Sequence, residues 1–169
     1  LADEARTRLA ALQPVRPALG GYSQVDPAAA PWQTGHFAIG FDQQSGAIDR
    51  LTDLRTGRRW ATPAFPLGAI SYQAFDESDY TRFHRQYVNK SEEIAWWAIP
   101  DFTKPGIDAA GAQSHRWAPQ LDAIYQRQDK AGHTFLLLLA AGEQVSQALG
   151  CPRHFTVEVH LPDDAPVID

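Results

Sequence analysis

Methionine is absent from this 169-residue sequence, and cysteine occurs only once. Because translation starts at methionine and the chain begins at Leu1, we expect the sequence to be a piece of a longer protein. A strong strand pattern at 155–161 lies close to the other end, so we also expect a sheet that is truncated there. The single thiol, Cys151, excludes an internal disulfide and leaves the cellular compartment open.

Long apolar runs and an excess of positive charge are also absent. The longest apolar stretch, residues 135–141, is far shorter than the roughly 20 residues that cross a bilayer. The formal net charge is −5, whereas nucleic acids and anionic membranes select basic surfaces. The sequence therefore predicts neither a nucleic-acid partner nor a membrane partner. Its 44% hydrophobic content is enough for the core of one domain.

Motifs of covalent and metal catalysis are missing as well. The sequence has no phosphate-binding loop, dinucleotide fingerprint or nucleophile elbow. His154 and His160 share one face of a predicted strand, but six residues at ~3.4 Å place them roughly 20 Å apart, whereas zinc holds its ligands at about 2 Å. Cys151 lacks a flanking catalytic motif and is interpreted as an inert buried thiol. We therefore assign no catalytic residue and no metal site.

What the sequence does contain is a strong β pattern. Phe37, Ile39 and Phe41 occupy alternate positions, which places all three on one face of a strand. Two turn signals follow at 43–46 and 53–57, and each ends in a glycine that suits a tight reversal. This stretch predicts three antiparallel strands with a buried apolar face.

Three later segments carry the same signal. Residues 133–140 are apolar on both faces, which predicts a central strand. Residues 121–125 alternate, and the turn at 129–132 joins them to that strand as a hairpin. The odd-numbered, apolar positions of 155–161 are expected to face inward. The chain is therefore predicted to be mainly β, an antiparallel β-sandwich.

Helical patterns precede and interrupt the strands. Residues 1–12 carry an apolar stripe at helical spacing and are interpreted as the tail of an upstream helical region. Residues 13–34 are rich in proline and glycine and are predicted to form a linker, which assigns 35–169 to the sandwich. A short inserted helix is expected after Asp76, a candidate N-cap.

The expected helix carries groups suited to acid–base chemistry. Tyr80, Arg82, His84 and Arg85 would supply a proton donor and two cations for a sugar carboxylate if they converged. On a helix, however, Tyr80 and His84 share one face while Arg82 points away, and Tyr80 also belongs to the apolar stripe. Helix surface and packing are therefore the competing interpretation.

A second candidate site lies just beyond this helix. Trp96 and Trp97 are followed by a segment with two prolines and a glycine, residues 100–106, which predicts a rigid loop. Aromatic faces stack on sugar rings, and Asp101 and Lys104 would hydrogen-bond sugar hydroxyls. The alternative is that both tryptophans close the core of the sandwich.

These stretches resemble a known family. The run FDQQSGAIDRLTDLRTGRRW at 41–60 resembles the opening of the β-sandwich that follows the catalytic and helical regions of family 38 glycoside hydrolases, the α-mannosidases. Residues 67–75 with 79–83, 97–106 and 150–153 are similar to a mannosidase-like family, domain of unknown function 5054. The resemblance implies a galactose-mutarotase-like supersandwich.

The resemblance implies an accessory part of a larger carbohydrate-active protein. The catalytic aspartate and the zinc ligands of such mannosidases belong to an upstream domain, and no residue here matches them, so we expect no cofactor in this chain. The expected partners are that upstream catalytic domain and a glycan. The candidate glycan contacts are Trp96, Trp97, Asp101, Lys104, His84 and Arg85.

Two alternatives remain open. An autonomous sandwich-fold sugar epimerase or polysaccharide lyase would need Tyr80, His84 and Arg85 in one cleft. A purely structural or assembly module would have buried aromatic side chains and no cleft.

Overall fold

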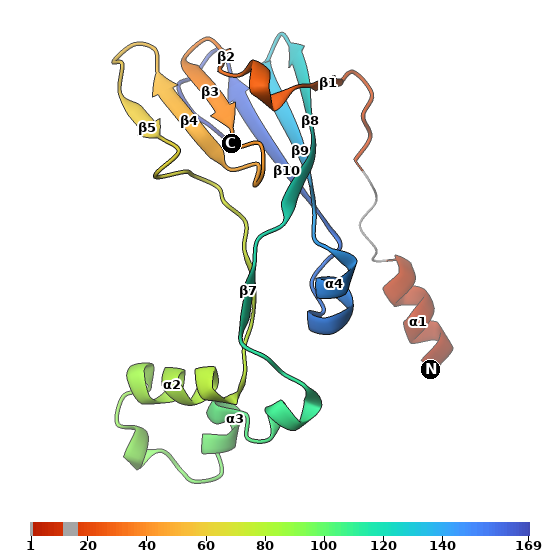
Figure 1. Ribbon diagram of the computed structural model, residues 1–169, viewed down its shortest axis with the longest axis vertical. Helices are drawn as coiled ribbons and strands as arrows, with labels where there is room; N and C mark the ends of the chain where they lie inside the picture. Colours follow the sequence, from red (N-terminus) through yellow and green to blue (C-terminus); the bar gives the residue numbers. More distant parts are fainter. Residues whose placement is uncertain (1, 12–16) are drawn as a thin grey trace.

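The structure is a computed structural model that describes residues 2–11 and 17–169, shown in Figure 1. In chain order, the elements are α1 (Ala2–Ala11), β1 (Ser23–Val25), η1 (Pro27–Ala29), β2 (Trp32–Gln33), β3 (Phe37–Phe41), β4 (Ile48–Asp53), β5 (Arg59–Ala61), β6 (Tyr72–Ala74), α2 (Glu77–Tyr87), η2 (Ser91–Glu93), α3 (Ile99–Thr103), η3 (Ile107–Ala110), β7 (His115–Trp117), β8 (Gln120–Asp129), β9 (Gly132–Ala140), α4 (Glu143–Leu149) and β10 (His154–Pro162).

Two antiparallel sheets form a β-sandwich. One sheet has the strand order β1-β8-β9-β10 and the other has the order β2-β3-β4-β5 (Figure 1). The expected meander is confirmed as β3, β4 and β5, and the expected central strand is β9, which pairs with β8 on one side and β10 on the other. The chain is mainly β, as the sequence predicts.

The core lies between the two sheets. Ile39 and Phe41 of β3 and Phe135 of β9 have no exposed surface. The rings of Phe41 and Phe135 lie 5.2 Å apart, which joins the two sheets directly. Burying side chains of this size contributes about 1.5–3 kcal/mol each. On β10, Val159 and Leu161 complete the inward face.

The proline-rich segment before the meander contributes more than a linker. Within residues 13–34, β1 pairs with β8 and β2 pairs with β3. The Trp32 ring packs 5.2 Å from the Phe135 ring. Single prolines are compatible with short edge strands, which explains why this composition does not exclude sheet pairing. Residues 1 and 12–16, which include Leu1 and Leu12 of the expected helical stripe, lie outside the described residues.

A β-bulge changes the expected alternation in β8. The pairing with β9 shifts between Leu121 and Ala123. As a result Leu121 and Ile124, three residues apart, both pack on the core, and the alternation expected over 121–125 is interrupted. A bulge adds one residue to a strand and so reverses the alternation beyond it.

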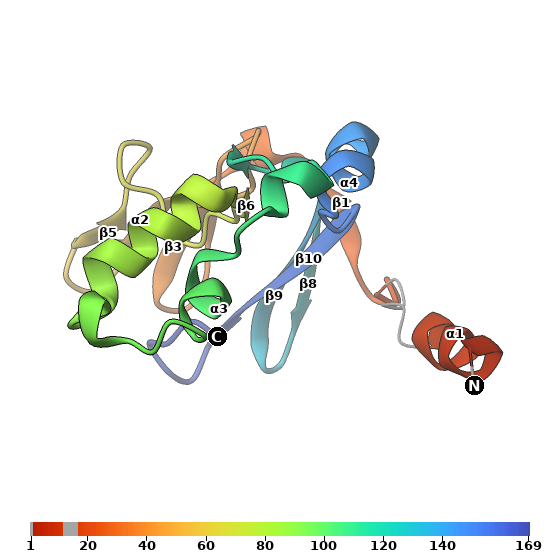
Figure 2. The same ribbon diagram turned by 90° about the horizontal axis from the view of Figure 1, so that it is seen from below.

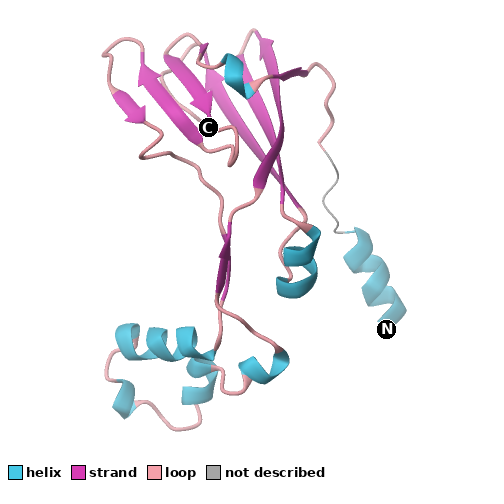
Figure 3. Cartoon of the chain, viewed as in Figure 1, coloured by secondary structure: helices cyan, strands magenta, loops and turns pink. Residues whose placement is uncertain are grey.

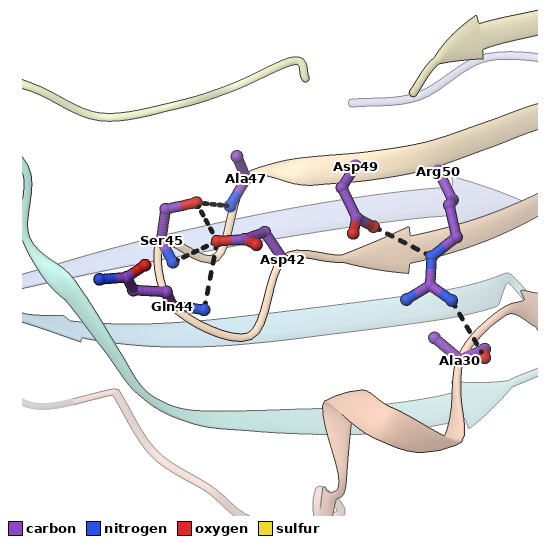
Figure 4. A network of polar contacts seen from close by, with 7 residues as sticks. All are labelled: Ala30, Asp42, Gln44, Ser45, Ala47, Asp49 and Arg50. Atoms are coloured by element: carbon purple, nitrogen blue, oxygen red, sulfur yellow. Dashed lines mark hydrogen bonds and ion pairs between the residues drawn. The ribbon is translucent and has the colours of Figure 1, made fainter. Parts of the chain in front are cut away.

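The first meander turn is organised by one carboxylate. Asp42 Oδ1 accepts hydrogen bonds from the backbone N–H and the hydroxyl of Ser45, both at 2.6 Å, and from the backbone N–H of Gln44 at 3.2 Å (Figure 4). These bonds, that of the Ser45 hydroxyl above all, lower the pKa of Asp42. Gly46 follows with a φ of 70°, a left-handed conformation that favours glycine.

The second meander turn repeats the same chemistry. Asp53 Oδ1 accepts from the backbone N–H groups of Arg55 at 2.8 Å and Thr56 at 2.9 Å. Gly57 then adopts a φ of 70°. The backbone bond from Thr56 is the main cause of the lowered pKa of Asp53. Because an aspartate closes each turn, the two turn signals of the sequence are real chain reversals.

An arm projects from the sandwich between β5 and β8. We define the arm as residues 72–117; it leaves the sandwich through the two-stranded ribbon β6–β7 and carries α2, η2, α3 and η3 at its far end (Figures 1 and 3). Residues 68–75 also have strand character in the sequence, but only Tyr72–Ala74 forms a strand, β6, and it belongs to this ribbon rather than to the sandwich. The expected short helix is therefore part of a larger helical insertion.

A small second core connects the base of the arm to the sandwich. Val145 of α4 and Cys151 are buried and pack with Tyr72 and Trp117 of the ribbon and with Phe155 of β10. Burial raises the pKa of the thiol, which keeps it protonated and agrees with an inert cysteine.

Candidate functional site

Helix α2 of the arm begins at a capping box. The Asp76 side chain accepts a 2.9 Å hydrogen bond from the backbone N–H of Asp79, and the Asp79 side chain accepts from the backbone N–H of Asp76. The Ser78 hydroxyl also donates to Asp76 and is the main cause of its lowered pKa. The predicted N-cap is confirmed, and it fixes the helix start.

Helix α2 buries polar residues and exposes aromatic ones. Asp79 and His84 are buried, whereas Phe83 is 51% exposed and Tyr87 is 73% exposed. Phe83 and Tyr87, which follow Tyr80 at helical spacing, therefore do not form a packed face of the helix. An aromatic helix face open to solvent is unusual in a folded domain and marks a place where another molecule can bind.

The exposed aromatic face lines a groove between α2 and α3, which lie side by side in Figure 2. Its volume is about 490 Å³, in the range of small-molecule binding sites. The residues that line this groove come from the end of the ribbon and from both helices: Phe75, Asp79, Tyr80, Arg82, Phe83, Gln86, Tyr87, Asp101 and Phe102.

The aromatic rings of the groove are arranged in pairs. The ring centroids of Phe75 and Tyr80 lie 6.1 Å apart, and those of Phe83 and Tyr87 lie 5.3 Å apart. Both pairs are tilted, a favourable aromatic geometry. Phe102 of α3 supplies a fifth ring on the same groove and is 40% exposed. The groove thus offers flat apolar faces to a ligand.

Two carboxylates border these rings, and they differ in their surroundings. Asp79 accepts hydrogen bonds from Arg82 and from the Ser114 hydroxyl, and the latter is the main cause of its lowered pKa. Asp101 is exposed, and within the described part of the chain its side chain has no hydrogen-bond or ion-pair partner. Asp101 is the candidate residue that the structure places in this groove.

Arg85 lies in a separate hollow of about 560 Å³. Arg82 and Gln86 border both this hollow and the aromatic groove, so they form the ridge between them. On the far side of the ridge Arg85 shares its hollow with Glu77 and Asp108. Arg85 therefore does not line the aromatic groove.

His84 faces α3 and lines neither hollow. Its ring lies 6.0 Å from the Phe102 ring, and its Nε2 atom is buried without a hydrogen-bond partner among the described residues. Tyr80, His84 and Arg85 consequently have three different surroundings. The structure does not bring them into the one cleft that an epimerase or a lyase would need.

The two tryptophans are exposed on the arm. Trp96 is 82% exposed and Trp97 is 66% exposed, so the interpretation that they close the sandwich core is wrong. The predicted rigid loop at 100–106 is also wrong in part, because Ile99–Thr103 forms α3, with Pro100 in the first turn where proline is compatible with a helix. Lys104 is the C-cap of α3 and does not line the groove.

The family described as Domain of unknown function (DUF5054) matches residues 1–169. The chain belongs to this family. No curated protein matches it, and no solved structure matches it. The DUF5054 match confirms the family that residues 67–75, 79–83, 97–106 and 150–153 resemble.

The described residues of this DUF5054 chain contain neither a membrane-spanning helix nor a cluster of metal-ligating side chains. None of their helices has the length and apolar character needed to span a bilayer. Among them, no three histidine, cysteine, aspartate or glutamate side chains gather in a way that would hold a metal ion.

Sequence reasoning missed most of the groove. The aromatic stripe Tyr80, Phe83 and Tyr87 is visible in the sequence, but a stripe of this kind normally packs against a core. The signal that distinguishes this case is the second helix, α3, which is too short to cover the stripe. The groove combines apolar ring faces, a free carboxylate and a paired arginine.

Proposed function

We propose that this chain is a non-catalytic accessory β-sandwich of a larger glycoside-hydrolase-like protein of the α-mannosidase type. In this proposal the sandwich supports the catalytic domain of the parent protein, and the groove on the arm binds a glycan. Any zinc belongs to that catalytic domain. The resemblance of residues 41–60 to the post-catalytic sandwich of α-mannosidases is the basis of the parent assignment.

The groove is the single observation that supports glycan binding. Sugar rings present C–H faces that stack on aromatic rings, and hydroxyl groups that hydrogen-bond to carboxylates, amides and guanidinium groups. Phe83 and Tyr87 supply exposed ring faces, while Gln86, Arg82 and Asp101 supply the polar groups in the same groove. The ligand would lie on helices rather than on loose loops, which favours a defined geometry.

The alternatives fit the geometry less well. An epimerase or a lyase needs convergent acid, base and anion-binding groups, and His84 and Arg85 lie apart from Tyr80. A purely structural module would bury its aromatic side chains, whereas Phe83, Tyr87, Trp96 and Trp97 are exposed.

Calorimetric titration tests glycan binding. We expect manno-oligosaccharides to bind the chain. We also expect Phe83→Ala to raise the dissociation constant about tenfold, because the variant loses ring stacking. Phe65→Ala is the matched control, because Phe65 is 78% exposed and lies outside the arm. Absence of binding up to about millimolar ligand would contradict the proposal, as would equal losses in the two variants.

A hydrolysis assay tests the accessory role. The chain alone should not cleave aryl α-mannosides, with or without added zinc. Turnover that a single substitution within this chain abolishes would overturn the accessory assignment.

A further inference from the structure

We infer that the aromatic groove selects a glycan that carries a protonated amine, that is, an amino sugar. This inference rests on the glycan binding proposed above and goes further by naming the class of ligand. It is argued from the charges that border the groove and from the faces of its rings.

The first observation is the charge that remains after internal pairing. Three charged side chains line the groove, and two of them, Asp79 and Arg82, pair with each other. The third, Asp101, has no ion pair or hydrogen bond to any of the residues that the structure describes. One uncompensated negative charge is therefore left at the groove, on α3.

The second observation is the ring content of the groove. Phe83 and Tyr87 are paired at 5.3 Å, and Phe102 lies on the neighbouring helix beside Asp101. The face of an aromatic ring carries a negative electrostatic potential and attracts a cation within about 6 Å. Rings and carboxylate together thus favour a ligand that is both apolar on one face and positively charged.

The same charges disfavour an acidic glycan. The negative charge of such a ligand would be repelled by the Asp101 carboxylate. Arg85, the arginine that does not pair with Asp79, lies across the ridge in the other hollow. That hollow also contains Glu77 and Asp108, two carboxylates against the one positive charge of Arg85, because Arg82 pairs with Asp79. A sugar ring with an ammonium group would place its positive charge near Asp101 and an apolar face against the rings of the groove.

Two oligosaccharides of equal length provide the test. Chito-oligosaccharides with free amino groups are protonated in mildly acidic buffer, whereas their fully N-acetylated forms are neutral. By calorimetry at low salt, we expect the chain to bind the amino form about tenfold more tightly, from the exposed carboxylate and the ring faces together. The preference should decline as salt screens the charge.

The variant Asp101→Asn isolates the carboxylate. It should remove most of the preference for the amino form, because it should weaken binding of the amino form more than binding of the N-acetylated form. Asp164→Asn is the matched control, because Asp164 is also exposed but lies after β10, outside the arm. The control variant should keep the full preference.

The outcomes separate the two proposals. Equal binding of both forms to the unmodified chain overturns the amino-sugar inference but leaves glycan binding in place. If Asp101→Asn keeps the full preference for the amino form, the inference is also overturned, because it is argued from this carboxylate. Failure of both forms and of manno-oligosaccharides to bind overturns the proposed function itself.

Discussion

The hydroxyl of Tyr72 donates a 2.6 Å hydrogen bond to the backbone carbonyl of Leu149, 77 positions away in the sequence. Tyr72 begins the ribbon of the arm, and Leu149 ends α4. The bond therefore joins the base of the arm to the sandwich side of the molecule, together with the apolar contacts of Trp117 and Val145.

Removing the Tyr72 hydroxyl should loosen the arm. We expect Tyr72→Phe to keep the ring packing, to lose about 1 kcal/mol of stability at the ribbon, and to speed hydrogen exchange of the β6 and β7 amides. The matched control is Tyr87→Phe, whose hydroxyl is on an exposed side chain in the arm. Equal exchange rates in both variants would show that the hydroxyl does not hold the ribbon.

The aromatic contact across the sandwich should dominate stability. Phe135→Ala removes a fully buried ring that packs on Phe41 and Trp32, so we expect a loss of about 3–5 kcal/mol in the free energy of unfolding. Phe65→Ala, at a position 78% exposed, should change it by less than about 0.5 kcal/mol. Chemical denaturation of both variants measures the difference. Similar values for the two would contradict the core assignment.

The first meander turn should make stability depend on pH. The pKa of Asp42 is lower in the folded chain than in the unfolded one, chiefly because the Ser45 hydroxyl donates to its carboxylate. The contribution of the Asp42 carboxylate to folding stability is therefore fully present above the unfolded pKa of about 3.9. It is lost as the pH falls through the lower folded pKa.

The variant Asp42→Asn tests this sign. Its free energy of unfolding should be lower than that of the unmodified chain by roughly 1 kcal/mol at pH 7. This difference in stability should shrink below about pH 4. Urea denaturation at a series of pH values measures it. A gap that widens on acidification would show that the carboxylate does not stabilise the turn.

The capping box should control helix α2 without affecting the sandwich. In Asp76→Ala the backbone N–H of Asp79 loses its acceptor, so the first turn of α2 should fray and its amides should exchange faster. The amides of β9, in the centre of a sheet, should keep their protection. Asp76→Asn retains a side-chain oxygen and should restore slow exchange in α2. Faster exchange in β9 as well would indicate that arm and sandwich unfold together.

The sequence by itself determined the sandwich. Alternation at Phe37, Ile39 and Phe41 defines an inward face, and the repeated aspartate and glycine turns fix the meander, because both signals act between residues near in sequence. The capping box at Asp76 is local in the same way. The central strand β9 is also recognisable, because burial on both faces favours a continuous apolar run, here residues 135–140.

Only the tertiary structure decided which aromatic side chains are buried and which are exposed. Trp32 enters the core and Phe83 stays exposed, and this difference depends on which distant segments pack beside them. The β8 bulge and the placement of His84, Arg85 and Tyr80 in three surroundings follow from pairing and packing that no local spacing encodes. The groove exists because α3 lies beside α2 without covering it, and that arrangement depends on contacts between segments distant in the sequence, such as the bond from the backbone N–H of Gly106 to Glu77.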